Sequence, residues 1–181
     1  MTPMLVVMAG LPGAGKSTLA RALALETGAV LLSVDTVEAA MWRAGAGGPV
    51  HPSVPSGLAA YGVVQAQTGE LLAAGHTVIA DAVNAVEPAR AAWRDLAAEH
   101  GAPIRWIEVT CSDPTVHRER LAGRGTRYAG FAEPTWAEVA ARTMEVWSDD
   151  RLVLDTSRSL DGLVDAALAY VSQAAHDAQM R

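Results

Sequence analysis

The sequence predicts an α/β fold in which helices cover both faces of a mostly parallel sheet. Apolar, β-branched runs alternate along the chain with alanine-rich stretches of helical period, which is the pattern of repeated βα units. Half of the 181 residues are apolar but only 5% are aromatic, and this composition favours closely packed helices over an aromatic-rich β-sandwich. Because short strands joined by helical crossovers pair in parallel, we expect a three-layer arrangement.

The first half of the chain is expected to hold three strands, each followed by helical sequence. The run MLVVMA at 4–9 is continuously apolar, and the following STLARALALE has apolar residues at helical spacing. Strands are predicted near 4–9, 30–34 and 77–81, and helices near 16–27, 36–44 and 58–74. Residues 45–57 are too rich in glycine and proline for a helix, so they are expected to form a loop.

The second half of the chain continues this alternation. Strands are predicted near 104–110 and 151–155, and helices near 87–99, 114–123, 135–147 and 160–175. Asp113 before Pro114 is typical of a helix start, and Thr135 with Glu138 forms a candidate capping box. Residues 123–134 are expected to form a second long loop, and long loops on such scaffolds often bind ligands.

Composition excludes several functional classes. The formal net charge of −6 gives no basic field, so broad wrapping of nucleic acid is not expected. Cys111 is the only cysteine, which excludes an intrachain disulfide and a cysteine-based zinc site. The apolar run from Met4 to Ala9 is too short for a signal peptide or a membrane span. We therefore expect a cytoplasmic, single-domain protein over residues 1–181, with no membrane partner.

The segment GLPGAGKS, from Gly10 to Ser17, fits the pattern G-x-x-x-x-G-K-[ST] between a predicted strand and a predicted helix. Its glycines let successive backbone N–H groups converge on phosphate oxygens, and the helix N-terminus adds a positive dipole end. Lys16, the only lysine among 14 basic residues, is expected to reach the β- and γ-phosphates. The Ser17 hydroxyl is expected to ligate Mg²⁺. The alternative is a glycine-rich turn without a ligand.

The phosphate loop predicts ATP and Mg²⁺ as ligands. The residues expected to bind the nucleotide are Gly10, Leu11, Pro12, Gly13, Ala14, Gly15, Lys16, Ser17 and Thr18. A guanine-reading [NT]-K-x-D motif is excluded, because the chain has no lysine beyond Lys16.

With this loop, the chain resembles small P-loop kinases of the zeta-toxin, chloramphenicol phosphotransferase and polynucleotide kinase branch, among AAA-domain-type ATP-binding proteins. Gluconate and shikimate kinases are more distantly similar. The resemblance implies a three-layer αβα P-loop NTPase fold with a five-stranded parallel sheet of order 2-3-1-4-5. It also implies an acceptor-binding segment at about 36–80 and a lid at about 118–134.

Two aspartates at predicted strand ends carry the resemblance further. It implies that Asp35, in LLSVD, is the general base that takes the proton of the acceptor hydroxyl. The alternative is that Asp35 caps the next helix, with Glu38 completing a capping box. Asp81, in TVIAD, would help to hold Mg²⁺ or contact the acceptor, or else be a turn carboxylate. Asn84 also fits the family spacing, but a capping box with Glu87 is the favoured interpretation.

The lid is indicated by the run RLAGR, which resembles the R-L-x-x-R motif of these kinases. Arg120 and Arg124 are four residues apart and share one helix face. The resemblance implies that Arg120 stacks on adenine and that Arg124 meets the transferred phosphoryl group. Arg118 and Arg127 are weaker candidates. An ordinary solvated basic helix end is the alternative.

The acceptor segment is poor in cations, because Arg43 is the only Lys or Arg between Thr36 and Ala80. With Trp42 as an expected wall of the pocket, this favours a neutral or weakly polar hydroxyl compound such as an antibiotic, nucleoside or sugar derivative. Arg90 and Arg94 could reach the cleft, so an anionic acceptor is disfavoured without being excluded.

Two other functions remain open at this stage. The first is a polynucleotide 5′-hydroxyl kinase, which would need a basic groove. The second is a non-catalytic ATP-binding regulatory protein, which would need neither Asp35 nor the lid arginines. His51, in the first loop, is a weak candidate for substrate contact, and Cys111 is expected to be a packing residue.

Overall fold

The computed structural model describes residues 3–46, 55–124, 133–159 and 162–179, with side chains up to residue 173. Its sheet contains five strands, β1 (Leu5–Ala9), β2 (Val30–Ser33), β3 (Val78–Asp81), β4 (Ile104–Thr110) and β5 (Leu152–Asp155). All pairings are parallel and the order is β2-β3-β1-β4-β5. The predicted α/β class and strand order are therefore confirmed.

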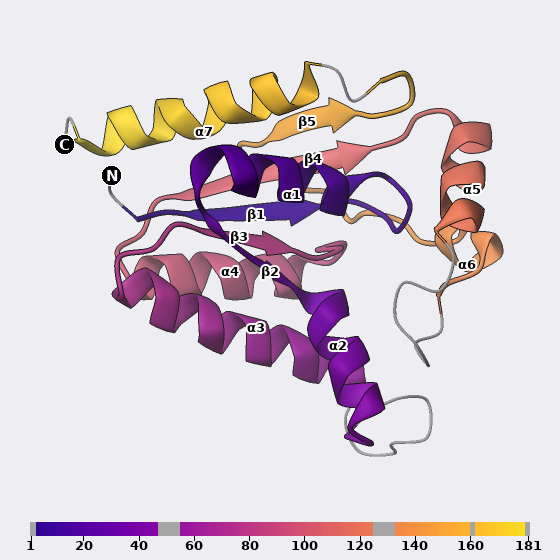
Figure 1. The fold of residues 1–181 in the computed structure, drawn as a ribbon, viewed down its shortest axis with the longest axis horizontal. Helices are drawn as coiled ribbons and strands as arrows, with labels where there is room; N and C mark the ends of the chain where they lie inside the picture. Colours follow the sequence, from indigo (N-terminus) through magenta and orange to yellow (C-terminus); the bar gives the residue numbers. More distant parts are fainter. Residues whose placement is uncertain (1–2, 47–54, 125–132, 160–161, 180–181) are drawn as a thin grey trace.

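Seven helices are described, and they surround the sheet (Figure 1). They are α1 (Lys16–Thr27), α2 (Val34–Arg43), α3 (Ser56–Ala73), α4 (Glu87–Glu99), α5 (Pro114–Gly123), α6 (Trp136–Ala140) and α7 (Leu163–Gln179). Helices α1 and α7 cover one face, and α3 and α4 cover the other (Figure 1). The short helices α5 and α6 lie beyond the carboxyl ends of the strands.

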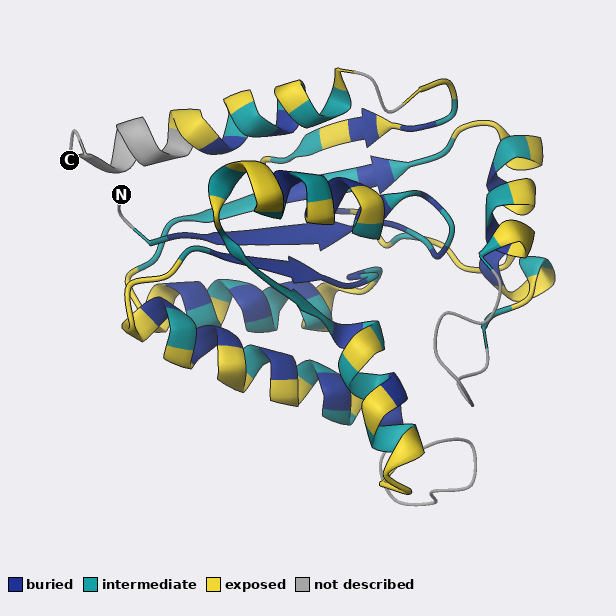
Figure 2. Ribbon diagram, in the orientation of Figure 1, coloured by how far each residue is buried: buried dark blue, intermediate teal, exposed yellow. Residues whose placement is uncertain are grey.

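Two apolar clusters, one on each face of the sheet, hold the layers together. On the α1 and α7 side, Leu19 and Leu23 pack against Ile79 and Ile107. On the α3 and α4 side, Val64 and the fully buried Trp93 belong to the second cluster. Figure 2 shows β1 and β3 buried throughout, while the outer faces of the helices are exposed. Such a strand, buried on both faces, requires the continuous apolar run that β1 has.

The predicted helix at 135–147 was wrong in its second half, since α6 ends at Ala140. The chain beyond it runs back toward the sheet, where the Glu145 amide donates to the Ala85 carbonyl at 2.9 Å. Trp147 then packs edge-on against Trp106 at 5.1 Å between ring centroids. Burying the Trp147 ring outweighs the local helical preference of this segment.

The alternative interpretation of Asp35 as a helix cap and the favoured interpretation of Asn84 as one are both wrong. Helix α2 begins at Val34, with Ser33 as its N-cap, so Asp35 lies inside the first turn and caps nothing. Helix α4 has Val86 as its N-cap, and Asn84 is instead fully buried with φ 51°. The Asn84 side chain donates to the Met8 carbonyl at 2.7 Å and accepts from the Trp93 indole at 3.0 Å. The caps at Asp113 and Thr135 are confirmed.

None of the described helices combines the length and apolar character needed to span a membrane.

Candidate active site

The glycine-rich turn between β1 and α1 has a backbone that only glycine adopts without strain. Gly10 has φ 134°, and a Cβ atom there would lie 2.1 Å from the Val109 carbonyl oxygen of β4. Gly15, the N-cap of α1, has φ 98°. These conformations aim the turn and the first amides of α1 at the carboxyl edge of the sheet, where anions bind at helix N-termini.

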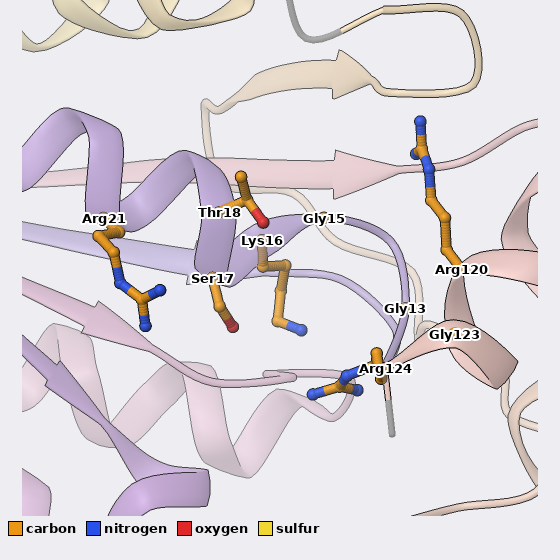
Figure 3. A pocket seen from close by; sticks show the side chains of 9 residues that line it. All are labelled: Gly13, Gly15, Lys16, Ser17, Thr18, Arg21, Arg120, Gly123 and Arg124. Carbon is orange, nitrogen blue, oxygen red and sulfur yellow. The ribbon is translucent and has the colours of Figure 1, made fainter. Parts of the chain in front are cut away.

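A pocket of about 560 Å³ opens in front of this turn (Figure 3). Its lining residues are Gly13, Gly15, Lys16, Ser17, Thr18, Arg21, Arg120, Gly123 and Arg124. This lining contains four cationic side chains and no carboxylate, so its charge suits a polyanion such as a triphosphate. The Lys16 ammonium group and the Arg124 guanidinium lie on the same side of the turn (Figure 3). We call this cavity the phosphate pocket.

The predicted nucleotide-binding residues divide into two groups. Most of them line the phosphate pocket, whereas Gly10, Leu11, Pro12 and Ala14 do not. Ala14 is buried, and its carbonyl accepts a hydrogen bond from the buried Thr156 hydroxyl at 2.8 Å.

Helix α5 is attached to the turn at two points. The Arg120 guanidinium donates to the Thr156 hydroxyl at 2.7 Å and to the Thr156 carbonyl at 2.8 Å. His117 Nε2 donates to the Pro12 carbonyl at 2.8 Å, and both groups are buried. Thr156 therefore bridges the lid arginine and the phosphate loop. Sequence reasoning missed His117 and Thr156, although the position of Thr156 directly after β5 could have indicated it.

Asp81 ends β3 in a smaller cavity of about 200 Å³ that Ser17, Arg21 and Thr36 also line. Asp81 is 4% exposed, and its Oδ1 atom has no hydrogen-bond partner among the described residues. Burying a carboxylate oxygen without a hydrogen-bond partner costs free energy of folding unless a cation binds to it. Carboxylate and hydroxyl oxygens are ligands that Mg²⁺ prefers, so Asp81 and Ser17 fit that ion.

The described residues contain no group of three His, Cys, Asp or Glu side chains able to hold a metal by themselves.

A second large cavity, of about 610 Å³, lies between α2, α3 and the segment that leads into α6. We call it the acceptor pocket. It is lined by Pro12, Val34, Asp35, Glu38, Trp42, Gly57, Tyr61, Val83, Arg124, Glu133, Pro134, Thr135, Glu138 and Arg142. Arg124 lines both this pocket and the phosphate pocket, so the two cavities meet at its guanidinium.

Asp35 and Arg124 lie together at that junction. Arg124 Nη2 is 3.9 Å from Asp35 Oδ2, and Arg124 Nη1 is 3.5 Å from Glu133 Oε2. Arg124 is 17% exposed and Asp35 is 39% exposed, so the carboxylate is open to a ligand while the arginine is largely enclosed. The structure thus brings the predicted base and the predicted lid arginine side by side.

Tyr61 forms part of the acceptor pocket and was not predicted. Burial raises the pKa of Tyr61 to about 12, and the nearby Asp35 and Asp81 carboxylates act in the same direction. The Tyr61 hydroxyl oxygen accepts a hydrogen bond from the backbone N–H of Asn84 at 3.1 Å. Tyr61 is therefore a neutral phenol at physiological pH.

Only some of the other residues predicted to contact the acceptor line the acceptor pocket. Trp42 lines it as expected, but Arg43 does not, and Asp81 lines the cavity beside Ser17 instead. Arg90 is fully buried and donates to the Asn84, Ala85 and Val146 carbonyls. Arg94 pairs with Glu87 and with Asp149. Neither arginine lines the acceptor pocket.

Some weaker candidates can be placed only in part. His51 and Arg127 lie outside the described residues, as do residues 47–54 of the first loop and 125–132 of the lid. The Arg118 guanidinium carbon lies 5.5 Å from the centroid of the Trp136 ring. This contact indicates a role in packing. Cys111 is half-buried and contacts the Asp113 carbonyl through its sulfur atom at 3.6 Å.

Comparison with known proteins gives one family match and several structural neighbours. The family model described as AAA domain matches residues 5–146. A candidate kinase of Chloroflexus aurantiacus is 23% identical with a TM-score of 0.81, and the alignment covers 96% of this chain and 99% of that chain. None of the curated proteins matches the chain significantly.

Two further neighbours are named kinases. A gluconokinase from Sinorhizobium meliloti has a TM-score of 0.67 at 18% identity, covering 99% of this chain and 97% of its own. The APS kinase CysC of Mycobacterium tuberculosis, in complex with AMPPNP and APS, has a TM-score of 0.66 at 20% identity. The alignment covers 94% of this chain and 98% of that chain. At these identities the likeness establishes a shared fold, which is that of P-loop kinases.

Proposed function

The chain belongs to the AAA domain family, and on that premise we propose that it is an ATP-dependent phosphotransferase acting on a hydroxyl group of a small molecule. The observation that carries this proposal is the junction of the two pockets. Arg124 lines both, and its guanidinium lies 3.9 Å from the Asp35 carboxylate. A donor in one cavity and an acceptor in the other would meet between these two side chains.

The donor would be ATP with its phosphates in the phosphate pocket. The turn amides, the Lys16 ammonium and the Arg124 guanidinium supply positive charge where the β- and γ-phosphates would lie. Ser17 and Asp81 would hold Mg²⁺, which supplies charge neutralisation on the phosphate oxygens. Arg120 lines the same cavity, and its predicted contact with adenine is part of this proposal.

Asp35 would act as the general base. A hydroxyl group is a weak nucleophile, and a carboxylate within hydrogen-bond distance orients it and takes its proton. The acceptor oxygen forms the new bond to the γ-phosphorus, and the bond to the β–γ bridging oxygen breaks. Its electron pair leaves with ADP. The hydroxyl proton passes to the Asp35 carboxylate and then to solvent, while Arg124 stabilises charge on the transferred phosphoryl group.

The finer assignment, to the branch of zeta toxins, chloramphenicol phosphotransferases and polynucleotide kinases, rests on the lid run RLAGR and on Asp35. A single kinase domain spanning 1–181 is part of the same proposal. A small acceptor is favoured over a nucleic-acid 5′ end because the acceptor pocket is lined by four carboxylates, which repel a phosphate backbone. A regulatory ATP-binding protein would need no base at the junction.

The proposal is tested by ADP release from Mg-ATP in the presence of sugars, nucleosides, antibiotics and 5′-hydroxyl oligonucleotides. We expect at least one small hydroxyl compound to raise ADP release well above the acceptor-free rate and to gain one phosphoryl group by mass spectrometry. ADP release that no acceptor changes would contradict the kinase assignment.

A further inference from the structure

The acceptor pocket carries more negative than positive charge. Its lining holds four carboxylates, from Asp35, Glu38, Glu133 and Glu138, and two guanidiniums, from Arg124 and Arg142. Among the described residues the formal charge of the lining is therefore −2. An anionic acceptor would meet repulsion here, whereas a cationic one would be attracted.

Three of the four carboxylates have an arginine nearby. Glu138 closes the capping box of α6, where it accepts from the Thr135 amide at 2.7 Å, and Arg142 adds a favourable charge. Asp35 and Glu133 share the single guanidinium of Arg124. The second carboxylate oxygen of Glu133, Oε1, is buried without a hydrogen-bond partner among the described residues. The two guanidiniums of the pocket thus do not neutralise its four carboxylates.

Among the described residues, Glu38 is held in place by neutral groups. The Trp42 indole donates to the Ser56 hydroxyl at 2.8 Å, and that hydroxyl donates its one proton to Glu38 Oε1 at 2.5 Å. No ion pair among the described residues includes Glu38. The chain of bonds fixes a carboxylate beside an aromatic ring on one wall of the pocket.

The Glu38 carboxylate and the Trp42 ring together suit an ammonium group. A protonated amine binds carboxylates through charge-assisted hydrogen bonds, and it binds the faces of indole rings through cation–π attraction. Glu38 lies three residues after Asp35 in α2, so the two side chains project from neighbouring positions about 5–6 Å apart at Cβ. An acceptor could place a hydroxyl at Asp35 and an amine at Glu38 across one sugar-sized ring.

Resting on the proposed function, we infer that the acceptor is a hydroxyl compound bearing a protonated amine, of the amino-sugar or aminocyclitol class. The Glu38 carboxylate and the Trp42 ring bind the amine while the reacting hydroxyl lies at Asp35. This differs from the expectation drawn from the sequence, which was a neutral or weakly polar compound and rested on Trp42 and on the scarcity of Lys and Arg between Thr36 and Ala80. The carboxylates of Glu133 and Glu138 come from a distant part of the chain.

The test uses acceptors that differ in charge. Glucosamine, N-acetylglucosamine, glucose and gluconate are compared, together with neamine and its fully N-acetylated form, by kcat/KM for ADP release and by product mass. The same compounds are titrated calorimetrically into the protein saturated with AMPPNP and Mg²⁺. We expect the amine-bearing compounds to exceed their acetylated, neutral or anionic counterparts by at least about tenfold.

Glu38→Gln should reduce that preference for the amine to within about threefold, while the affinity for AMPPNP stays the same. Glu26→Gln removes the same charge from the exposed end of α1 and should keep the preference. Equal or better use of neutral or anionic acceptors by the parent protein would overturn the inference and leave the kinase proposal standing. So would a preference that survives Glu38→Gln. ADP release independent of every acceptor would overturn both proposals.

Discussion

The Arg124 guanidinium lies 3.9 Å from the Asp35 carboxylate, at the point where the phosphate pocket and the acceptor pocket meet. Arg124 belongs to the end of α5 and Asp35 to the first turn of α2. The cation that would contact the γ-phosphoryl group thus also contacts the proposed base. When ATP phosphates attract Arg124, Asp35 would be released toward the acceptor hydroxyl.

Asp35→Asn tests the general base. The amide keeps the size of the side chain but cannot take a proton, so we expect kcat to fall by about 10²–10⁴-fold. ATP affinity, measured by calorimetry, should not change. Asp95→Asn, an exposed position on α4, is the matched control and should keep full activity. Turnover of the Asp35 variant at the parent rate would mean that another group accepts the proton.

Arg124→Ala tests the shared cation. Loss of the guanidinium removes charge stabilisation at the transferred phosphoryl group, so kcat should fall by about 10²–10³-fold. Arg124→Lys should recover only part of this, because an ammonium group lacks the planar fork of donors. Arg118→Ala, on the exposed side of the same helix, should have little effect on kcat. Equal losses in the two alanine variants, measured by steady-state ADP release, would argue against a specific role for Arg124.

Gly10→Ala and Gly75→Ala separate steric overlap from backbone strain. Both glycines have positive φ, which costs an alanine roughly 1 kcal/mol or more. At Gly75 nothing lies within 4 Å of an added Cβ, whereas at Gly10 the Val109 carbonyl oxygen lies at 2.1 Å. Urea unfolding should therefore show a clearly larger loss of stability for Gly10→Ala. Equal losses would contradict the close approach of the phosphate loop to β4.

Asp155→Asn tests a pH-dependent contact at the end of β5. The Ser112 hydroxyl and the Ser112 and Ser157 amides donate to the Asp155 carboxylate and hold its pKa well below the usual range. A lowered folded-state pKa gives stability that is fully present above the ordinary aspartate pKa, about 3.9, and is lost as pH falls through the folded value. Between pH 5 and pH 2 the parent should lose more stability than the variant, as measured by thermal unfolding. Parallel pH profiles would contradict this.

Local patterns in the sequence were enough to predict most of the fold. The apolar run of β1 and the glycines and lysine after it specify a strand, a turn and a helix over residues 5–27. The strand order came from a family resemblance, since pairing between distant strands leaves no local pattern. The helix at 135–147 was overpredicted because Trp147 packs against Trp106, a contact that no local pattern reveals.

The candidate site was predictable where a single residue type carries the chemistry. Lys16 and Ser17 were singled out in this way from the phosphate-loop pattern, whereas the roles of Asp35 and Arg124 came from the family resemblance. Asn84 was misinterpreted because its buried bonds to Met8 and Trp93 depend on three separate segments. Thr156 and the charge of the acceptor pocket were missed for the same reason, since both arise from residues brought together only by folding.

The central claim is that the turn from Gly10 to Ser17 binds the phosphates of ATP, and calorimetric titration of Mg-AMPPNP into the parent protein and into Lys16→Ala tests it most directly. Lys16 lines the phosphate pocket and is only 7% exposed, so its ammonium lies where the phosphates would bind. We expect one site per chain in the parent protein and an affinity at least about tenfold weaker in the variant, because a charge-assisted contact to phosphate is lost. Equal affinity in the two proteins, or no binding to the parent, would contradict it.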